Sequence, residues 1–205
     1  MPQLLLATNN AGKVHEYQSL LDGCGWQLVT PRHLAIDLTA EESANTYEEN
    51  AKIKALEGAK LSGRVTLGDD SGIEVEAMGG DPGVRSARFL GEDASYEQRF
   101  AEIARRLEGR TADERRARFV CVIAVADPET GDVRLVRGEA PGLIAIEPRG
   151  EGGFGYDPIF WLPELSATMA ELPEHQKNIV SHRARAVAPA RQILKELLHE
   201  YEHAA

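Results

Sequence analysis

Short apolar runs and amphipathic stretches follow one another along the whole chain, and the first of them predict a strand that leads into a helix. Residues 3–7 read QLLLA, a run that is typical of a buried strand. The polar stretch TNNAGK follows at residues 8–13 and indicates a turn. Apolar side chains at helical spacing over residues 13–23 then predict a helix that ends near Gly23.

The next helix has signals at both of its ends. Thr46 and Glu49 have the spacing of a capping box, in which two side chains satisfy each other's backbone amides. Gly63 suits the C-terminal cap, because glycine adopts left-handed backbone angles easily. The run RVTLGDD at residues 64–70 then predicts a strand that ends in an acidic loop.

The second half of the chain contains more strand signals than helix signals. Ser95 and Gln98 repeat the capping-box spacing before an amphipathic helix. Apolar runs at residues 117–126, 132–140 and 142–148 then indicate consecutive strands. The first two of these runs are joined by DPETG, a hairpin-like turn.

A helix is predicted to close the chain from about Ser181 to Glu202, and Pro189 must kink this helix or delay its start. Three strands in a row without intervening helices argue against a pure series of β–α–β units. No repeat, low-complexity segment or linker divides the chain. We therefore predict one domain over residues 1–205, of the α/β class with a mixed sheet.

The composition is that of an ordinary globular protein. A chain of 205 residues with 42% hydrophobic and 27% charged residues is long enough to bury a sizeable core. It has no apolar run of membrane-spanning length and no signal-peptide pattern at its start, so a cytoplasmic location is expected. Cys24 and Cys121 lack the spacing of a metal site and are expected to be reduced, structural cysteines.

The net charge limits the kinds of partner. The 23 basic and 33 acidic residues give a net charge of −10. This charge repels nucleic acid and anionic lipid, because non-specific affinity for nucleic acid comes from phosphate neutralisation. We therefore expect no nucleic-acid and no membrane partner. A small phosphorylated ligand stays compatible, because it needs only a local cluster of cations, amides or a bridging metal.

The stretch TNNAGK combines several features of a phosphate-binding loop. It lies between the first strand and the first helix, where free amides and the helix dipole favour an anion. Gly12 allows close approach of the backbone, and Lys13 adds a positive charge. Asn9 and Asn10 can donate side-chain hydrogen bonds. The stretch lacks the GxxxxGK[ST] pattern of a Walker A loop, and an N-capped turn with a surface lysine explains the same residues.

Two adjacent acids, Asp69 and Asp70, follow the strand that is predicted after the second helix. Neighbouring strand residues face opposite ways, so both acids reach one site only if the chain turns there, and Ser71 and Gly72 are expected to supply that turn. A carboxylate at a strand end suits Mg²⁺, which proteins hold through one or two carboxylates and substrate phosphates. The same acid can polarise a water molecule, and AEE at residues 40–42 offers a partner acid. A solvated turn is the alternative.

A glycine-rich loop and a cationic stretch complete the candidate chemistry. GEGGFGYDPIF places Phe154 and Tyr156 beside flexible backbone, which suits stacking on a flat ring whose edge Asp157 or nearby amides can contact. KNIVSHRARA places cations at a predicted helix start, where the helix dipole disfavours them. Core aromatics and surface cations are the alternatives for these two stretches.

Together these stretches fit a ligand of the size of a nucleoside triphosphate. TNNAGK, EENAKIKA, DDSGIEVEAMGGDPGVRSAR, GGFGYDPIF and SHR occur in the order and approximate spacing of the inosine triphosphate pyrophosphatase family, whose bacterial members are dITP/XTP pyrophosphatases. The resemblance runs from Leu5 to the last helix. It implies a two-lobed α/β fold with an elongated mixed sheet and flanking helices around a central nucleotide-binding cleft, in a protein that is usually a homodimer.

The resemblance also implies roles for individual residues. Glu41 and Asp70 resemble the magnesium-binding acids, and Asp70 is also the implied proton acceptor for the attacking water. Lys54 is similar to a helix lysine near the phosphates, and Ser71 resembles a substrate contact. The implied phosphate loop is Thr8, Asn9, Asn10, Ala11, Gly12 and Lys13, and the implied base and sugar site is Phe154, Gly155, Tyr156, Asp157, Lys177, His182 and Arg183.

We therefore expect a magnesium-dependent hydrolase that converts ITP, dITP and XTP to the monophosphate and pyrophosphate, which removes deaminated purines from the nucleotide pool. A related pyrophosphatase for other modified nucleotides and a nucleotide sensor without catalysis are the alternatives. The acids at positions 41 and 70 argue against a sensor, because a sensor needs no group that activates water. Arg85 and Arg88 are expected to be structural arginines, paired at the surface.

Overall fold

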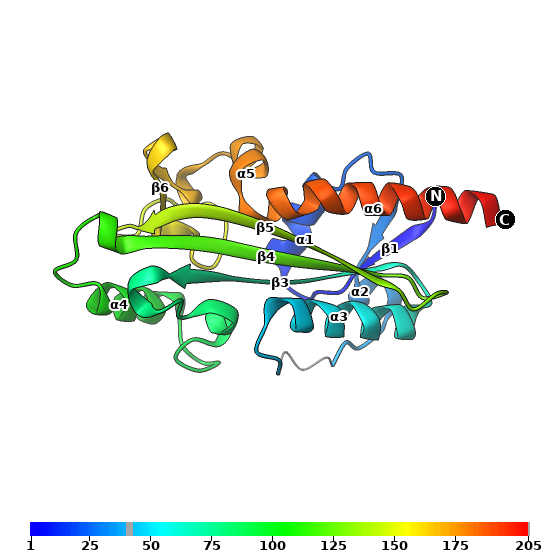
Figure 1. Cartoon of the computed structure of the whole chain (residues 1–205), viewed down its shortest axis with the longest axis horizontal. Coiled ribbons are helices and arrows are strands. Elements are labelled where there is room, and N and C mark those ends of the chain that lie inside the picture. Colours follow the sequence, from blue (N-terminus) through cyan, green and yellow to red (C-terminus); the bar gives the residue numbers. More distant parts are fainter. Residues whose placement is uncertain (40–42, 205) are drawn as a thin grey trace. The chain divides into compact units, whose positions relative to one another are not determined.

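The computed structural model describes residues 1–39 and 43–204 (Figure 1). The strands are β1 (Gln3–Leu6), β2 (Gln27–Val29), β3 (Thr66–Val75), β4 (Arg116–Ala126), β5 (Val133–Ile144), β6 (Phe160–Leu162) and β7 (Ala167–Thr168). The α-helices are α1 (Ala11–Leu20), α2 (Pro31–Leu34), α3 (Tyr47–Ser62), α4 (Tyr96–Arg106), α5 (Glu174–Val180) and α6 (His182–Ala204). Short 3-10 helices are η1 (Glu76–Met78), η2 (Gly83–Arg88), η3 (Asp113–Arg115), η4 (Asp157–Ile159), η5 (Pro163–Leu165) and η6 (Met169–Glu171).

The strands form a seven-stranded sheet that combines parallel and antiparallel pairs. Its order is β2-β1-β3-β4-β5-β6-β7. β1 pairs in parallel with β2 and with β3, whereas β6 pairs antiparallel with β5 and with β7. The predicted α/β class with a mixed sheet is thus confirmed.

The chain divides into two compact units. Unit 1 comprises Met1–Asp70, Cys121–Gly138 and Arg183–Ala205, and unit 2 comprises Ser71–Val120 and Glu139–His182. β3, β4 and β5 contribute residues to both units. Each unit has a hydrophobic core of its own.

In unit 1, helices cover both faces of the sheet, and α3 and α6 lie on opposite sides of it (Figure 1). Alternate residues of β1 point to opposite faces, as strand geometry requires. Leu6 joins a core cluster with Tyr17 of α1 and Leu194 of α6. Leu5 meets α3 instead, where a Cβ atom at Gly58 would lie 3.1 Å from Leu5 Cδ2.

Gly68 lets β3 approach the backbone of α3 closely. A Cβ atom at this position would lie 2.6 Å from the carbonyl oxygen of Ala51 and 2.7 Å from the amide nitrogen of Ala55. Both atoms belong to the backbone, so a rotamer change in α3 cannot make room for a side chain. The contact therefore fixes the spacing between β3 and α3.

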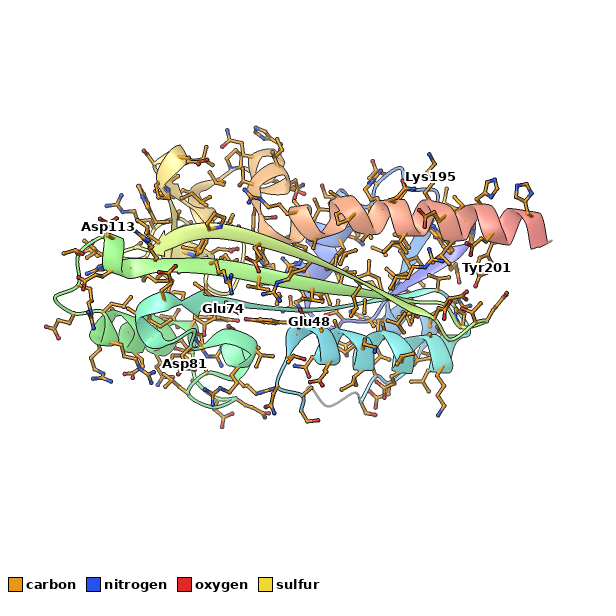
Figure 2. The ribbon with its side chains drawn as sticks, in the orientation of Figure 1. Glu48, Glu74, Asp81, Asp113, Lys195 and Tyr201 are labelled. Carbon is orange, nitrogen blue, oxygen red and sulfur yellow. The ribbon has the colours of Figure 1, made fainter. Side chains whose placement is uncertain are left out.

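The C-terminal part of α6 is anchored within unit 1 through Tyr201, which Figure 2 labels. The Tyr201 ring packs edge to face on Trp26, with 5.9 Å between the ring centroids. The Tyr201 hydroxyl donates to Asp127 Oδ1 at 3.3 Å. The indole N–H of Trp26 donates to the carbonyl oxygen of Leu194 at 2.9 Å. These contacts give both aromatic residues the polar partner that their buried ends need.

The core of unit 2 includes Ile73 of β3, Ile103 of α4 and Phe160 of β6. α4 starts with the predicted capping box. The Ser95 hydroxyl accepts from the Gln98 amide at 3.3 Å, and the Gln98 side chain accepts from the Ser95 amide at 2.8 Å. The predicted start of this helix is therefore confirmed.

The prediction that β3 ends in an acidic loop is wrong. β3 continues through Ser71 and Gly72 to Val75, so these residues supply no turn. The turn preference of Asp, Ser and Gly is a weak local tendency, and pairing within a buried sheet overrides it. As a consequence Asp69 and Asp70 stay on opposite faces of the strand.

The second half of the sheet contains one strand where two were predicted. Residues 132–140 and 142–148 were expected to be separate strands, but β5 runs without a break from Val133 to Ile144. Gly142 does not interrupt β5. A Cβ atom at Gly142 would lie 2.6 Å from the carbonyl oxygen of Trp161, so glycine allows β6 to pack closely.

The cationic stretch KNIVSHRARA, residues 177–186, was predicted to lie around the start of one helix, but it is divided between α5 and α6. α5 ends at Val180, and α6 begins at His182 after the single residue Ser181. Pro189 lies inside α6 and therefore does not delay its start. Among the described residues, none of the helices combines the length and apolar character that crossing a membrane requires.

Candidate active site

The loop between β1 and α1 presents the amides of a helix start. α1 begins at Ala11, two residues earlier than predicted, so Lys13 lies in its first turn. Asn10 is the N-cap, and its Oδ1 accepts from the Lys13 amide at 3.0 Å. The Asn10 amide donates to Thr8 Oγ1 at 3.2 Å. The amides of Ala11 and Gly12 have no acceptor within the helix, which is the arrangement that binds anions at helix starts.

The side chain of Lys13 meets a carboxylate inside unit 1. Lys13 Nζ lies 3.0 Å from Asp69 Oδ1 and 2.9 Å from Asp69 Oδ2. Arg183 Nε lies 3.8 Å from the same Oδ2, and Arg183 also donates to Glu16. α1, β3 and α6 thus contribute to one buried ion-pair network. The alternative of Lys13 as a simple surface lysine is therefore wrong.

The network keeps its members charged. Burial by itself would raise the pKa of Asp69, but the positive charges of Lys13 and Arg183 lower it below its ordinary value. Burial acts in the opposite sense on Arg183, and the negative charges of Glu16 and Asp69 raise its pKa. The ionised carboxylate and the guanidinium therefore stabilise each other.

Two neutral groups lie beside this network. Tyr17 Oη and Cys121 Sγ are 3.8 Å apart. Burial, followed by the charge of Asp69, raises the pKa of Tyr17 and raises the pKa of Cys121 to about 12. Cys24 and Cys121 are both free thiols, as predicted, and Cys121 stays protonated at neutral pH.

Asp70 faces the other side of β3 and meets α3. Its Oδ2 accepts from Asn50 Nδ2 at 3.0 Å, and its Oδ1 lies 3.9 Å from Lys54 Nζ. Asn50 and Lys54 are four residues apart, so they share one face of the helix. Asn50 is held in place because its Oδ1 also accepts from the Ala44 amide at 3.1 Å. The Asp70 carboxylate is thus fixed by an amide and has an ammonium group nearby.

The donor chemistry at Asp70 suits Mg²⁺, although Asp70 alone does not complete a site. Carboxylate oxygens are the ligands that Mg²⁺ prefers. In the part of the chain that the structure describes, no group of three or more His, Cys, Asp or Glu side chains could hold a metal ion. Glu41, the predicted second acid, lies outside the described residues. Further ligands would have to come from Glu41 or from substrate phosphates, and the latter arrangement is common for Mg²⁺.

In unit 2, the glycine-rich loop is organised around Asp157. Asp157 Oδ2 accepts from the Phe154 amide at 2.8 Å and from Lys177 Nζ at 2.6 Å. Lys177 Nζ also lies 5.3 Å from the centroid of the Phe154 ring. Gly153 has a φ of +71°, and a Cβ atom there would collide with both Asp157 and Lys177. The structure thus brings together Phe154, Asp157 and Lys177, which were all predicted for the base and sugar site.

Tyr156 belongs to the core of unit 2 and does not offer its ring to a ligand. It is only 4% exposed, and its ring packs edge to face on Tyr96 at a centroid distance of 5.3 Å. Its hydroxyl donates to the carbonyl oxygen of Ser86 at 2.9 Å. Burial raises the pKa of this hydroxyl. The prediction of a stacking role for Tyr156 is therefore wrong, whereas Phe154 is half-buried.

The segment that follows β3 has a structural role. Ser86 Oγ accepts from the Ile73 amide at 2.9 Å and donates to the carbonyl oxygen of Gly83 at 2.6 Å. These bonds tie η2 to β3. The Arg85 side chain is 65% exposed and pairs with Asp81 at 2.9 Å, as expected for a surface arginine.

The sequence SHR contributes to both units. His182 is 5% exposed, and its ring stacks on Phe119 with 4.5 Å between centroids and 17° between planes. Arg183, the next residue, belongs to the ion-pair network of unit 1. The base-site roles of these two residues stay predictions. Ser71 is half-buried on β3 and directly follows Asp70.

Sequence reasoning missed Asn50, Glu16 and Phe119. Helical spacing could have found Asn50, because it lies one turn before Lys54. Glu16 likewise lies three residues after Lys13 on α1, although nothing in the sequence indicates that Arg183 is its partner. Phe119 sits in an ordinary apolar strand, and no local signal marks it as the partner of His182.

Comparison with known proteins gives a consistent result over nearly the whole chain. Residues 4–193 match the sequence profile of the Ham1 family. The dITP/XTP pyrophosphatase of Desulforamulus reducens is 47% identical over 195 residues, which cover 95% of this chain and 96% of that protein. The dITP/XTP pyrophosphatase of Shigella flexneri is 44% identical over 188 residues, with coverage of 91% and 95%.

Solved structures agree with this similarity. A HAM1 protein from Coxiella burnetii superposes with a TM-score of 0.86 at 38% identity, over 96% of this chain and 100% of that chain. The Ham1 protein of Staphylococcus aureus gives a TM-score of 0.83 at 37% identity, over 95% and 98% of the two chains.

Proposed function

Because this chain belongs to the Ham1 family, we propose that it is a nucleoside triphosphate pyrophosphatase that hydrolyses ITP, dITP and XTP to the monophosphate and pyrophosphate. The observation that carries the proposal is the environment of Asp70. A buried carboxylate, oriented by Asn50 and with Lys54 at 3.9 Å, combines a proton acceptor with a neighbouring positive charge. Such a pair suits the attack of water on a phosphoric anhydride.

In the proposed reaction, water attacks the α-phosphorus and its proton passes to Asp70. A bond forms between the water oxygen and the α-phosphorus, and the bond from that phosphorus to the bridging oxygen breaks. Pyrophosphate leaves with the bonding electrons. The ammonium of Lys54 and the amides at the start of α1 offset negative charge on the phosphates.

Mg²⁺ is the cofactor that we propose, with Asp70 and Glu41 as its protein ligands. When bound, such an ion neutralises phosphate charge and stabilises the leaving group. The support from this chain is the carboxylate of Asp70, a hard oxygen donor next to the residues named above.

We propose that the loop around Phe154 and Asp157 recognises the purine base. Hypoxanthine and xanthine carry an oxygen at C6 and a proton on N1, whereas adenine has an amino group and an unprotonated N1. Lys177 is an ammonium donor beside a half-buried aromatic ring. A donor that faces O6 would be left unsatisfied by adenine, and such mismatches reduce reaction rates by orders of magnitude. We further propose that the protein is a homodimer and that it acts in the cytoplasm.

Incubation with ITP, XTP, GTP and ATP in the presence of Mg²⁺, with separate assays for pyrophosphate and phosphate, tests the proposal. ITP and XTP should release pyrophosphate far faster than GTP and ATP. Release of phosphate and IDP from ITP would contradict attack at the α-phosphorus. Equal values of kcat/KM for ITP and GTP would contradict the base preference.

A further inference from the structure

A cavity in unit 1 adjoins the β1–α1 loop and carries a cationic lining that the proposed reaction does not use. Its volume is about 360 Å³, within the usual range for small-ligand sites. Thr8 and Asn9 from the loop line one part of it. Arg32 and His33 of α2 and His15 of α1 also line it.

The charge of this lining is unusual for this chain. Three of its residues are basic types, Arg32, His15 and His33, and none of its residues is acidic. The chain as a whole has 33 acidic and 23 basic residues. The lining of this cavity, which has an arginine and no acidic residue, therefore differs in charge from the chain as a whole. A local cationic cluster of this kind attracts a small anion even on a negatively charged protein.

Arg32 is the cation with the greatest capacity to bind. Its side chain is exposed, and its guanidinium has no acidic or hydrogen-bond partner among residues 1–39 and 43–204. A guanidinium has five N–H donors in a fixed fork, which matches the oxygens of a phosphate group. Other exposed arginines of this chain, such as Arg85, are already paired with carboxylates.

Local hydrogen bonds anchor the backbone around Arg32. α2 starts with Pro31 after the N-cap Thr30, which is buried. The Thr30 amide donates to His33 Nδ1 at 3.1 Å. Because Nδ1 accepts this bond, the neutral His33 ring carries its proton on Nε2 and can act as a donor there. The cavity thus has a donor from each of two adjacent residues of α2.

We propose that this cavity binds a diphosphate group and that Arg32 determines the affinity. The proposal rests on the proposed function, because the adjoining loop is the predicted phosphate loop and pyrophosphate is the predicted product. The diphosphate has two possible sources, the β- and γ-phosphates of a bound nucleotide or the free pyrophosphate that hydrolysis releases. Both present the same oxygens to Arg32, His33 and Asn9.

The test is calorimetric titration of inorganic pyrophosphate into the full-length protein, with and without Mg²⁺. Arg32→Ala should weaken pyrophosphate binding about tenfold, the order expected for a charge-assisted hydrogen bond in an open site. Arg85→Ala is the matched control, because it removes the same charge from an exposed arginine that pairs elsewhere. Equal pyrophosphate affinities for the two variants would overturn the proposal.

Kinetics with ITP then separate the two sources. If the β- and γ-phosphates occupy the cavity, Arg32→Ala raises KM for ITP and leaves kcat nearly unchanged. If released pyrophosphate occupies it, KM for ITP stays constant and inhibition by pyrophosphate weakens. A protein that binds pyrophosphate through Arg32 but does not cleave ITP would contradict the proposed function and leave the cavity assignment supported.

Discussion

The two faces of β3 give its adjacent acids different surroundings. Asp69 lies against α1 and α6, where Lys13 Nζ is 2.9 Å from its Oδ2 and Arg183 Nε is 3.8 Å away. Asp70 lies against α3, where Asn50 donates to it at 3.0 Å and Lys54 Nζ stands at 3.9 Å. Both side chains are buried, so burial alone does not distinguish them.

The difference lies in how the protein compensates each charge. A close ammonium group and a guanidinium hold the pKa of Asp69 below its ordinary value, which makes Asp69 a poor proton acceptor and a strong anchor for Lys13 and Arg183. At Asp70, the Asn50 amide donates a neutral hydrogen bond that orients the carboxylate, and the Lys54 ammonium stands farther away, at 3.9 Å. Two identical residue types thus have different surroundings, and we propose that Asp69 positions Lys13 and Arg183 whereas Asp70 acts in the reaction.

The largest expected effect is loss of turnover in Asp70→Asn. The change removes the proposed proton acceptor and metal ligand but keeps the shape of the side chain, and loss of a general base costs about 10²–10⁴ in rate. The kcat for ITP, measured by pyrophosphate release, should fall by at least this factor while the thermal unfolding midpoint changes little. Asp113→Asn is the control, because this labelled aspartate lies in η3 and its side chain is 92% exposed (Figure 2). A kcat for Asp70→Asn close to that of the control would contradict the proposed role of Asp70 as proton acceptor.

Asp69→Asn should act mainly on stability. Removing the charge of Asp69 takes the close carboxylate from Lys13 and one of two acidic neighbours from Arg183, and breaking such a buried pair costs about 3 kcal/mol. The pKa of Asp69 lies below the ordinary value of 3.8, so its stabilising contribution is complete above that pH and is lost as the pH falls through the lowered folded value. Urea unfolding at pH 7, 4 and 3 measures this. The difference between wild type and variant should be largest at pH 7 and shrink in acid; a pH-independent difference would show that the charge is not the cause.

Lys13→Met should destabilise the protein less than Asp69→Asn does, and it tests how far Lys13 compensates the charge of Asp69. It removes the closest cation from Asp69 and leaves Arg183, so the pKa of Asp69 should rise and acid unfolding should begin at a higher pH than in wild type. The free energy of unfolding at pH 7 should fall by about 2 kcal/mol, as for a lost hydrogen bond between charged groups. KM for ITP should also increase, because the predicted phosphate loop loses its lysine. If acid unfolding and KM both stay at wild-type values, Lys13 is coupled neither to Asp69 nor to the substrate.

Arg85→Ala should have the smallest effect and sets the baseline for the others. The side chain is 65% exposed and pairs with Asp81 at the surface, and such pairs contribute less than about 1 kcal/mol. Thermal unfolding and kcat for ITP should both match wild type closely. A large drop in kcat would mean that an exposed arginine after β3 takes part in catalysis.

The sequence predicts well what depends on local spacing. The starts of α3 and α4 follow from Thr46 and Ser95, because a cap is an interaction among residues three positions apart. The fold class follows from the order of apolar runs. Phe154, Asp157 and Lys177 were assigned to one site by resemblance, and the structure brings them together.

The sequence fails where long-range contacts decide. Ser71 and Gly72 have turn chemistry, but pairing in the sheet keeps them in a strand. The ring of Tyr156 is next to glycines in the sequence, yet it is buried and packs edge to face on Tyr96 of α4. The partners of Asp69 come from positions 13 and 183, and no local pattern links residues so far apart.

The presence of glycine at position 68 has a consequence for the energetics of the proposed reaction. Because the backbones of β3 and α3 come close together at this position, their separation does not depend on the rotamer of a side chain at residue 68. In the proposed reaction, this close packing would preorganise the carboxylate on β3 and the ammonium on α3, which lowers the reorganisation energy that the transition state requires. An alanine at position 68 would widen this spacing and turn a fixed electrostatic environment into one that has to rearrange during each turnover.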